Sequence, residues 1–296
     1  MGGFNKLKFS FIFLFGIGIT SFTFCKSEKT NEAIRQTIYF EECEREYFIL
    51  KPQNFDPKIK YWPTVVVHGG GGNGRTYFMT KAMRAEADKQ GLETIVIAPS
   101  FSNTDFLASR FPELGEGDFL KQVLKDVSDK FSIHKKILLT GYSRGGQFTH
   151  RFALINPEYV KACAPFAAGT WTTPDGRLLI DSYGEVNDPE TFLLSGKIND
   201  EIPKRLHNLF QSRVAKVAGL KAKKEAENIP FLVMCGTLDT RYKIAQQFAE
   251  SLKSQGYKVQ VEWPRNPHGE KEKYQGEFSR YSEKAVEFFL NAIKCE

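Results

Sequence analysis

Histidine and cysteine are scarce in this chain, with five of each among 296 residues. No group of these residues and carboxylates has the spacing of metal ligands, so we expect no metal site and no cofactor. Basic stretches interleaved with aromatic residues are also lacking, and the net charge of +6 is modest and spread along the chain. We therefore expect no nucleic-acid partner. Length and composition fit one large α/β domain or two small ones.

A single long apolar run occurs, and it lies at the N-terminus. Lys6 and Lys8 precede an almost uninterrupted apolar stretch, Phe9–Phe24, after which the chain turns polar. A positive start, a short apolar segment and an abrupt polar boundary are typical of an export signal. We expect this signal over residues 1–25 and a polar linker over residues 26–36.

Cys25 stands where a bacterial lipoprotein signal has its lipidated cysteine, although Phe24 departs from the small residue usually found before it. The protein is therefore expected to be exported, either as a cell-envelope lipoprotein or as a secreted protein. A membrane is a partner only through a lipid on Cys25 or through a retained signal anchor. Pairing of Cys43 with Cys295 is open, because sequence alone does not assign disulfide connectivity.

A serine stands at a sharp turn between a predicted strand and a predicted helix. A short apolar run ends in Gly141-Tyr142-Ser143-Arg144-Gly145, and apolar residues at helical spacing begin at once. A Cβ at Gly141 or Gly145 would collide with the neighbouring strand or helix. The N–H of Arg144 would lie at a helix N-terminus, where it can donate to a developing oxyanion. The other interpretation is a glycine-rich turn with an exposed serine.

This strand, turn and helix form the nucleophile-elbow pattern, and in it the sequence resembles the α/β-hydrolase superfamily. A second feature agrees. The β-branched run before His68 has the composition of a buried parallel strand, and the glycine-rich segment Gly69–Gly74 follows it directly. In the resembled superfamily a His-Gly-Gly segment supplies the second oxyanion donor, which implies Gly70 for that role. A phosphate-binding loop is the weaker alternative, because no Gly-Lys-Ser/Thr follows.

Strands and helices alternate through residues 61–169, as a doubly wound parallel sheet requires. We predict an eight-stranded, mostly parallel sheet of the α/β-hydrolase type within a domain covering residues 37–296. The stretch 172–228 breaks the alternation, with a loop-like part and then one or two amphipathic helices. The resemblance implies that this insertion is a lid. Four aromatic residues are candidates for the substrate pocket or for ordinary core and surface positions: Phe101, Tyr142, Trp171 and Trp263.

A serine hydroxyl needs a base to take its proton, and the base needs a carboxylate to orient it. Among the histidines, only His268 lies in a loop after the last predicted strand, on the edge where Ser143 lies. Asp239 likewise follows a buried strand. The order Ser143, Asp239, His268 matches the superfamily. Of the remaining histidines, His68 is expected to anchor the glycine-rich loop and His134 to lie at the opposite edge of the sheet. His150 is expected inside a helix and His207 in the insertion.

These residues predict acyl transfer to water. The resemblance is to secreted esterases of the polyhydroxybutyrate depolymerase and feruloyl esterase type, and it implies a small-molecule or polymer ester as substrate. Two alternatives are a serine peptidase of the prolyl-oligopeptidase type and a non-catalytic cell-surface binding protein on a hydrolase scaffold. Room for the large N-terminal domain usual in such peptidases is lacking before residue 37, and every catalytic part expected of an enzyme is present.

Overall fold

The structure is a computed structural model that describes residues 32–75, 78–103, 108–180, 184–186, 207–267 and 274–294. Side chains are not described for residues 184–186, 207–211 and 274–277. The expected export signal with Cys25, the linker up to residue 31, His268 and Cys295 lie outside the described residues, as does most of the stretch 181–206.

Eight strands form the main sheet: β1 (Ile34–Phe40), β2 (Cys43–Leu50), β3 (Trp62–Val67), β4 (Thr94–Pro99), β5 (Ile137–Tyr142), β6 (Val160–Phe166), β10 (Phe231–Met234) and β11 (Val259–Glu262). Their order is β1-β2-β4-β3-β5-β6-β10-β11. β2 is antiparallel to both β1 and β4, so β1 runs in the same direction as the parallel strands. The predicted eight-stranded, mostly parallel sheet is confirmed.

The central strands have no solvent-facing side. Every residue of β4 and β5 is buried, as is every residue of β3 except Trp62. Parallel strands covered on both faces read as continuous apolar runs rather than as alternating ones, which is why the sequence marks them clearly.

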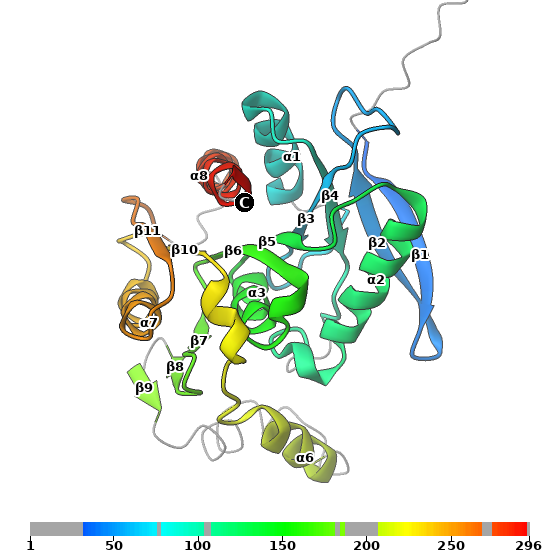
Figure 1. The fold of residues 1–296 in the computed structure, drawn as a ribbon. Coiled ribbons are helices and arrows are strands. Elements are labelled where there is room, and N and C mark those ends of the chain that lie inside the picture. The colour runs from blue at the N-terminus through cyan, green and yellow to red at the C-terminus, as the bar shows by residue number, and fades with distance from the viewer. Residues whose placement is uncertain are drawn as a thin grey trace, which may run out of the picture.

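Six α-helices are described: α1 (Phe78–Gln90), α2 (Glu116–Lys130), α3 (Arg144–Ile155), α6 (His207–Val217), α7 (Tyr242–Ser254) and α8 (Tyr274–Lys294). Three short 3₁₀ helices accompany them: η1 (Pro112–Leu114), η2 (Pro157–Tyr159) and η4 (Lys224–Asn228). Figure 1 looks onto the edge at which the parallel strands begin, with α1 and α8 on one face of the sheet and α2, α3 and α7 on the other. The carboxyl ends of these strands lie on the far side of the molecule in this view, and α/β sheets bind ligands at that edge.

The predicted insertion contains more strand than the sequence suggests. β7 (Thr170–Thr172), β8 (Leu178–Ile180) and β9 (Gly184–Val186) form a small antiparallel sheet where a loop was predicted. Strands of three residues are too short for alternation to show, which explains the difference. The predicted helical part corresponds to α6 and η4. In the described part of the chain, no helix has both the length and the apolar character needed to cross a bilayer.

Candidate active site

Ser143 occupies the turn between β5 and α3 in a strained backbone conformation. Its φ and ψ are 54° and −113°, values that L-residues rarely adopt. The N–H of Ser143 donates to the carbonyl of Phe166 on β6 at 2.9 Å, and its carbonyl accepts the N–H of Gln147 at 3.0 Å. From Ile137 to Leu154, Ser143 alone is not buried. The turn therefore leaves one partly exposed serine at the carboxyl edge of an otherwise buried strand and helix segment.

Glycines make this close turn sterically feasible. A Cβ on Gly145 would lie 2.2 Å from the carbonyl oxygen of Val67 on β3. A Cβ on Gly141 would lie 2.7 Å from the carbonyl carbon of Gly145. Real Cβ atoms do not approach other atoms this closely, so the prediction that side chains would collide at these two positions is confirmed.

The glycine-rich loop after β3 lies beside the serine. A Cβ built on Gly69 would be 3.8 Å from the Cβ of Ser143. The carbonyl oxygen of Gly69 has three hydrogen-bond partners: His68 Nδ1 at 2.8 Å, Arg144 Nη2 at 3.2 Å and the Gly72 N–H at 3.3 Å. Three partners fix the plane of the peptide that joins Gly69 to Gly70. In a trans peptide the Gly70 N–H then points away from these partners, which suits a donor that must stay unfilled until substrate binds.

His68 is an anchor of this loop. Its Nε2 accepts the N–H of Phe101 at 2.9 Å, which leaves the proton on Nδ1 to donate to the carbonyl of Gly69. Burial lowers the pKa of His68 to about 4, and a buried, neutral ring with both nitrogens bonded is poorly suited to act as a base. The expected anchoring role is supported.

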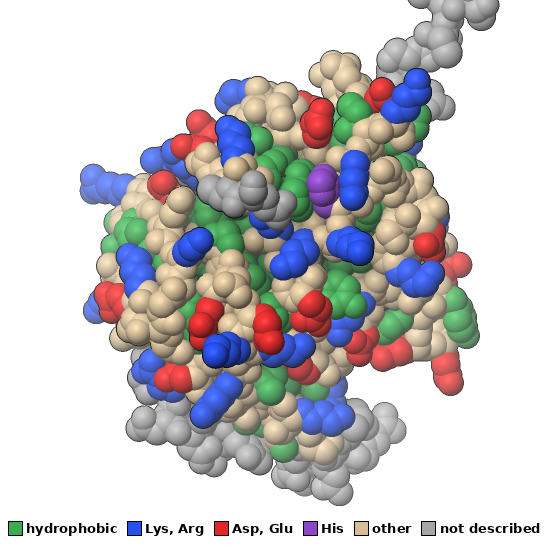
Figure 2. Space-filling model, viewed as in Figure 1, with side chains coloured by type: hydrophobic (Ala, Val, Ile, Leu, Met, Phe, Trp, Pro, Cys, Tyr) green, Lys and Arg blue, Asp and Glu red, His purple; other side chains and the backbone are tan. Residues whose placement is uncertain are grey.

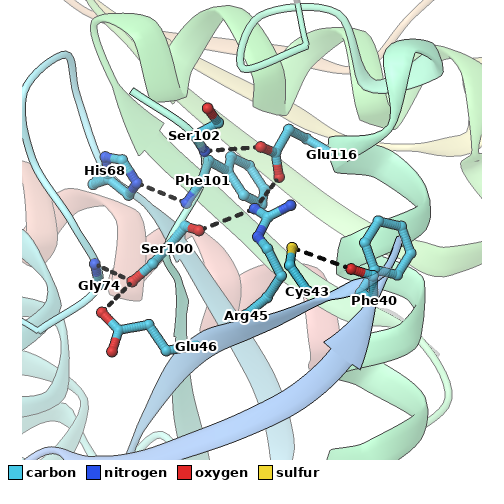
Figure 3. Close-up of polar contacts among 10 residues, drawn as sticks. All are labelled: Phe40, Cys43, Arg45, Glu46, His68, Gly74, Ser100, Phe101, Ser102 and Glu116. Carbon is cyan, nitrogen blue, oxygen red and sulfur yellow. Dashed lines mark hydrogen bonds and ion pairs between the residues drawn. The ribbon is translucent and has the colours of Figure 1, made fainter. Parts of the chain in front are cut away.

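The loop after β4 connects this anchor to the edge of the sheet (Figure 3). Arg45 on β2 donates to the carbonyl of Ser100 at 3.1 Å and pairs with the buried carboxylate of Glu116 at 2.8 Å. The second oxygen of Glu116 accepts the N–H of Ser102 at 2.8 Å. Phe101, between Ser100 and Ser102, donates its N–H to His68. A buried ion pair at the start of α2 is therefore linked through one short loop to the glycine-rich segment.

Arg144 contributes to the site at two places. Its N–H lies in the first turn of α3, where backbone donors have no partner within the helix. Its buried guanidinium turns back to donate to the carbonyl of Gly69 and to Oδ1 of Asn103. Burial lowers the pKa of Arg144, while nearby Glu116 opposes that change. One residue thus joins the elbow to the glycine-rich loop.

Asp239 follows β10 at the same edge of the sheet as Ser143. Its side chain is 1% exposed, and Oδ1 accepts the N–H of Arg241 at 3.0 Å. The guanidinium of Arg241 lies 3.6 Å from the same oxygen. β6 separates the strands that carry the serine and the acid, and the N–H of Ala167 after β6 donates to Met234 on β10 at 2.8 Å.

The segment leading to His268 is bonded to the loop that carries the acid. Thr237 donates its N–H to the carbonyl of Pro264 at 2.8 Å, and Leu238 donates to that of Asn266 at 3.3 Å. The structure therefore brings Ser143, Gly70 and Arg144 together, with the acid loop and the last described residues before His268 beside each other. His268 itself lies outside the described residues.

Two other histidines and most of the candidate pocket aromatics lie in the core or away from Ser143. His150 is fully buried: its Nδ1 bonds to the Gly146 carbonyl at 2.8 Å, and its Nε2 accepts the Thr172 N–H at 2.9 Å. His134 stacks on Trp62 with ring centroids 3.9 Å apart, at the edge opposite the serine. Three of the four candidate pocket aromatics are buried, whereas Trp263 is partly exposed.

Sequence reasoning missed two residues that shape this edge. Arg151, 3% exposed, donates to the hydroxyls of Thr170 and Thr172 at 2.8 Å each and so holds β7 against α3. Burial lowers the pKa of Arg151 to about 9. Ala167 has a φ of 44°, a strain that has no sequence signal in alanine. For Arg151 no local signal was available, because α3 also carries Arg144, Gln147, Thr149 and His150.

Among the described residues, no group of three or more histidine, cysteine or carboxylate side chains could hold a metal ion. The site offers the hydroxyl of a partly exposed serine, the nearby backbone of Gly70 and Arg144, and a buried carboxylate at the same edge of the sheet.

Comparison with known proteins finds similarity in fold rather than in sequence. No family profile matches the chain. No curated protein matches it either. Among solved structures, the chain is similar to FphF, a fluorophosphonate-binding serine hydrolase of Staphylococcus aureus, at 19% identity and a TM-score of 0.56, over 86% of this chain and 98% of that one. The chain is also similar to a ferulic acid esterase, at 16% identity and a TM-score of 0.62, over 86% of this chain and 98% of that one. A third similar structure is the acylaminoacyl peptidase of Pyrococcus horikoshii, at 18% identity and a TM-score of 0.57, over 89% of this chain and 41% of that one.

Proposed function

On the premise that the chain has the α/β-hydrolase fold, we propose that it is a serine esterase that hydrolyses carboxylic esters through an acyl-enzyme. The observation that carries this proposal is the strained, partly exposed Ser143 between a buried strand and a buried helix segment. Strain of this kind persists only where the surrounding structure holds it, and it is concentrated at active sites.

In the proposed reaction, the Oγ of Ser143 attacks the ester carbonyl carbon while His268 takes the hydroxyl proton. The tetrahedral intermediate collapses, the bond to the alcohol oxygen breaks, and His268 protonates the leaving alcohol. Water then attacks the acyl-enzyme by the same route and releases the acid. Asp239 orients His268 and stabilises its charged form. The hydrogen bonds between the loop of Asp239 and residues 264–266 support this pairing.

The N–H groups of Gly70 and Arg144 are proposed as the oxyanion hole. The peptide before Gly70 is already fixed by the three partners of the Gly69 carbonyl, so little reorganisation is needed as charge develops. Each donor is expected to stabilise the transition state by about 3 kcal/mol, a value measured in other serine hydrolases.

The deciding experiment compares Ser143→Ala with the wild type on p-nitrophenyl acetate and on a fluorophosphonate probe. The variant should lose at least about a thousandfold in kcat and all labelling, because the proposed acyl-enzyme forms on the hydroxyl that the substitution removes. Ser128→Ala is the matched control, since Ser128 is an exposed serine on α2. Full turnover in Ser143→Ala would overturn the assignment.

A second comparison separates the esterase from its alternatives. Methyl ferulate and short hydroxyacid esters should be cleaved faster than aminoacyl amides of similar size. Faster cleavage of the amides would indicate a peptidase of the prolyl-oligopeptidase type. Binding without labelling or turnover would indicate a non-catalytic protein on a hydrolase scaffold.

A further inference from the structure

Lysines gather at the edge of the sheet opposite the candidate active site. Four of the parallel strands begin at or just after a lysine, although these lysines are far apart in the sequence. They are Lys60 before β3, Lys135 and Lys136 before β5, Lys161 in β6 and Lys258 before β11. Figure 2 views the molecule from this side and shows Lys and Arg side chains across the middle of the face. We call this surface the lysine face.

The charge of the lysine face is available to a partner. All of its lysines except Lys161 are exposed, and these exposed lysines form no ion pair within the described part of the chain. Acids also lie at this edge, among them Glu93 before β4, Glu158 in η2, and Glu225 and Glu227 in η4, but Lys223 and Lys224 add to the lysines, and Glu158 pairs with Lys223 at 3.5 Å. Trp62, partly exposed and stacked on His134, lies at the same edge, and tryptophan favours the interface between water and lipid.

Two hollows flank the centre of this face. One, of about 470 Å³, is lined by three of the lysines and by apolar residues of β11, α8 and the segment before β10, among them Ile229, Val259 and Phe288. The other, of about 520 Å³, lies between α2 and the start of β5. Lysines line both hollows together with apolar residues, and basic groups beside apolar surface favour contact with anionic lipid.

The chain enters the domain at the border of this face. The sheet twists, so β1 runs across the view in Figure 1 rather than along it, and the start of β1 lies at the side of the domain. Nine residues, 25–33, separate Ile34 from the apolar run Phe9–Phe24, and nine residues span at most about 30 Å. An apolar run held in a bilayer would therefore keep the lysine face close to the lipid surface.

We propose that the lysine face docks on a bilayer surface rich in anionic lipid, with the edge that carries Ser143 directed away from the membrane. Each lysine near such a surface should increase the affinity about fivefold. The occupant is the lipid surface itself, because its charge complements the lysines and the N-terminal segment brings it within reach.

The test uses the full chain and vesicles of phosphatidylcholine alone or with about one third phosphatidylglycerol. The apolar N-terminus is the same on both vesicle types, so the ratio of the two affinities isolates the charge term. Lys135→Glu with Lys136→Glu should lower that ratio about 25-fold or more, because two favourable charges are lost and two unfavourable ones added, and high salt should abolish the wild-type preference. The matched control is Lys81→Glu with Lys243→Glu, which changes two exposed lysines near the starts of α1 and α7 and keeps the same net charge.

An equal loss in both double variants would show that net charge rather than the lysine face governs binding, and would overturn the proposal. An unchanged ratio in the Lys135 and Lys136 variant would overturn it as well. Lipid binding is measured without substrate, so these results are independent of whether Ser143 is catalytic.

Discussion

At the scale of single residues, His68 makes the fold sensitive to acid. Its pKa falls from 6.5 to about 4 on folding because burial disfavours the charged ring. Between these values the unfolded chain binds a proton that the folded chain does not, so the free energy of unfolding falls as pH falls. The full effect is about 3 kcal/mol between pH 7 and pH 4. Buried His150 acts in the same direction.

Urea unfolding across this pH range measures the effect. In His68→Gln the free energy of unfolding should depend less steeply on pH, since the titrating ring is gone. The same slope in the variant and in the wild type would mean that other groups cause the acid sensitivity.

Arg144 offers a second residue-scale prediction. Its guanidinium holds the Gly69 carbonyl, so Arg144→Met should loosen the peptide that presents the Gly70 N–H while leaving the N–H of residue 144 in place. We expect kcat to fall about 10- to 100-fold with KM nearly unchanged, because the oxyanion exists only in the transition state. Steady-state kinetics with p-nitrophenyl acetate and the affinity for a trifluoromethyl ketone check this.

Controls for Arg144 come from its neighbours. Arg144→Lys should recover part of kcat, and Asn103→Ala, which removes the other acceptor of the guanidinium, should have a smaller effect. If Arg144→Met kept full kcat, the side chain would have no positioning role.

At the scale of elements, the β1–β2 hairpin carries an avoidable strain. Its two-residue turn, Glu41 and Glu42, has positive φ at both positions, where glycine and asparagine are preferred. Glu42→Gly should raise the free energy of unfolding by about 1 kcal/mol, seen as a higher urea midpoint. The same change at Glu44, inside β2, should lower it. Equal effects at both positions would contradict the argument from backbone conformation.

Replacing glycine by alanine should have opposite outcomes at two positions. One lies where α3 packs closely against β3, and the other lies in the open glycine-rich loop. Gly145→Ala places a Cβ 2.2 Å from the Val67 carbonyl and should destabilise the fold by about 3 kcal/mol or more. Gly70→Ala meets nothing within 4 Å, keeps its N–H, and should change stability by less than about 0.5 kcal/mol. Thermal and urea unfolding of the two variants compare them directly. A folded Gly145→Ala of normal stability would show that the helix can shift away.

At the scale of the whole molecule, a feature can be predicted from the sequence when it depends on residues that are close together in the chain. The central strands and the turn at Ser143 are visible because periodicity and glycine spacing are local properties. The pair of Arg45 with Glu116 joins residues far apart in the chain, and no local pattern marks it. The same holds for the lysine face. Strands as short as β8 carry too few residues for a period.

The far end of the chain has a practical consequence. Asn291 and Ala292, in the last turn of α8, line the same hollow as Lys136 and Val160, so α8 finishes on the side opposite Ser143. A resin coupled through this end would leave the edge that carries Ser143 open to bulk solution. Immobilised enzyme should accordingly turn over soluble esters as fast per molecule as free enzyme, and a column built this way could be reused without loss of access.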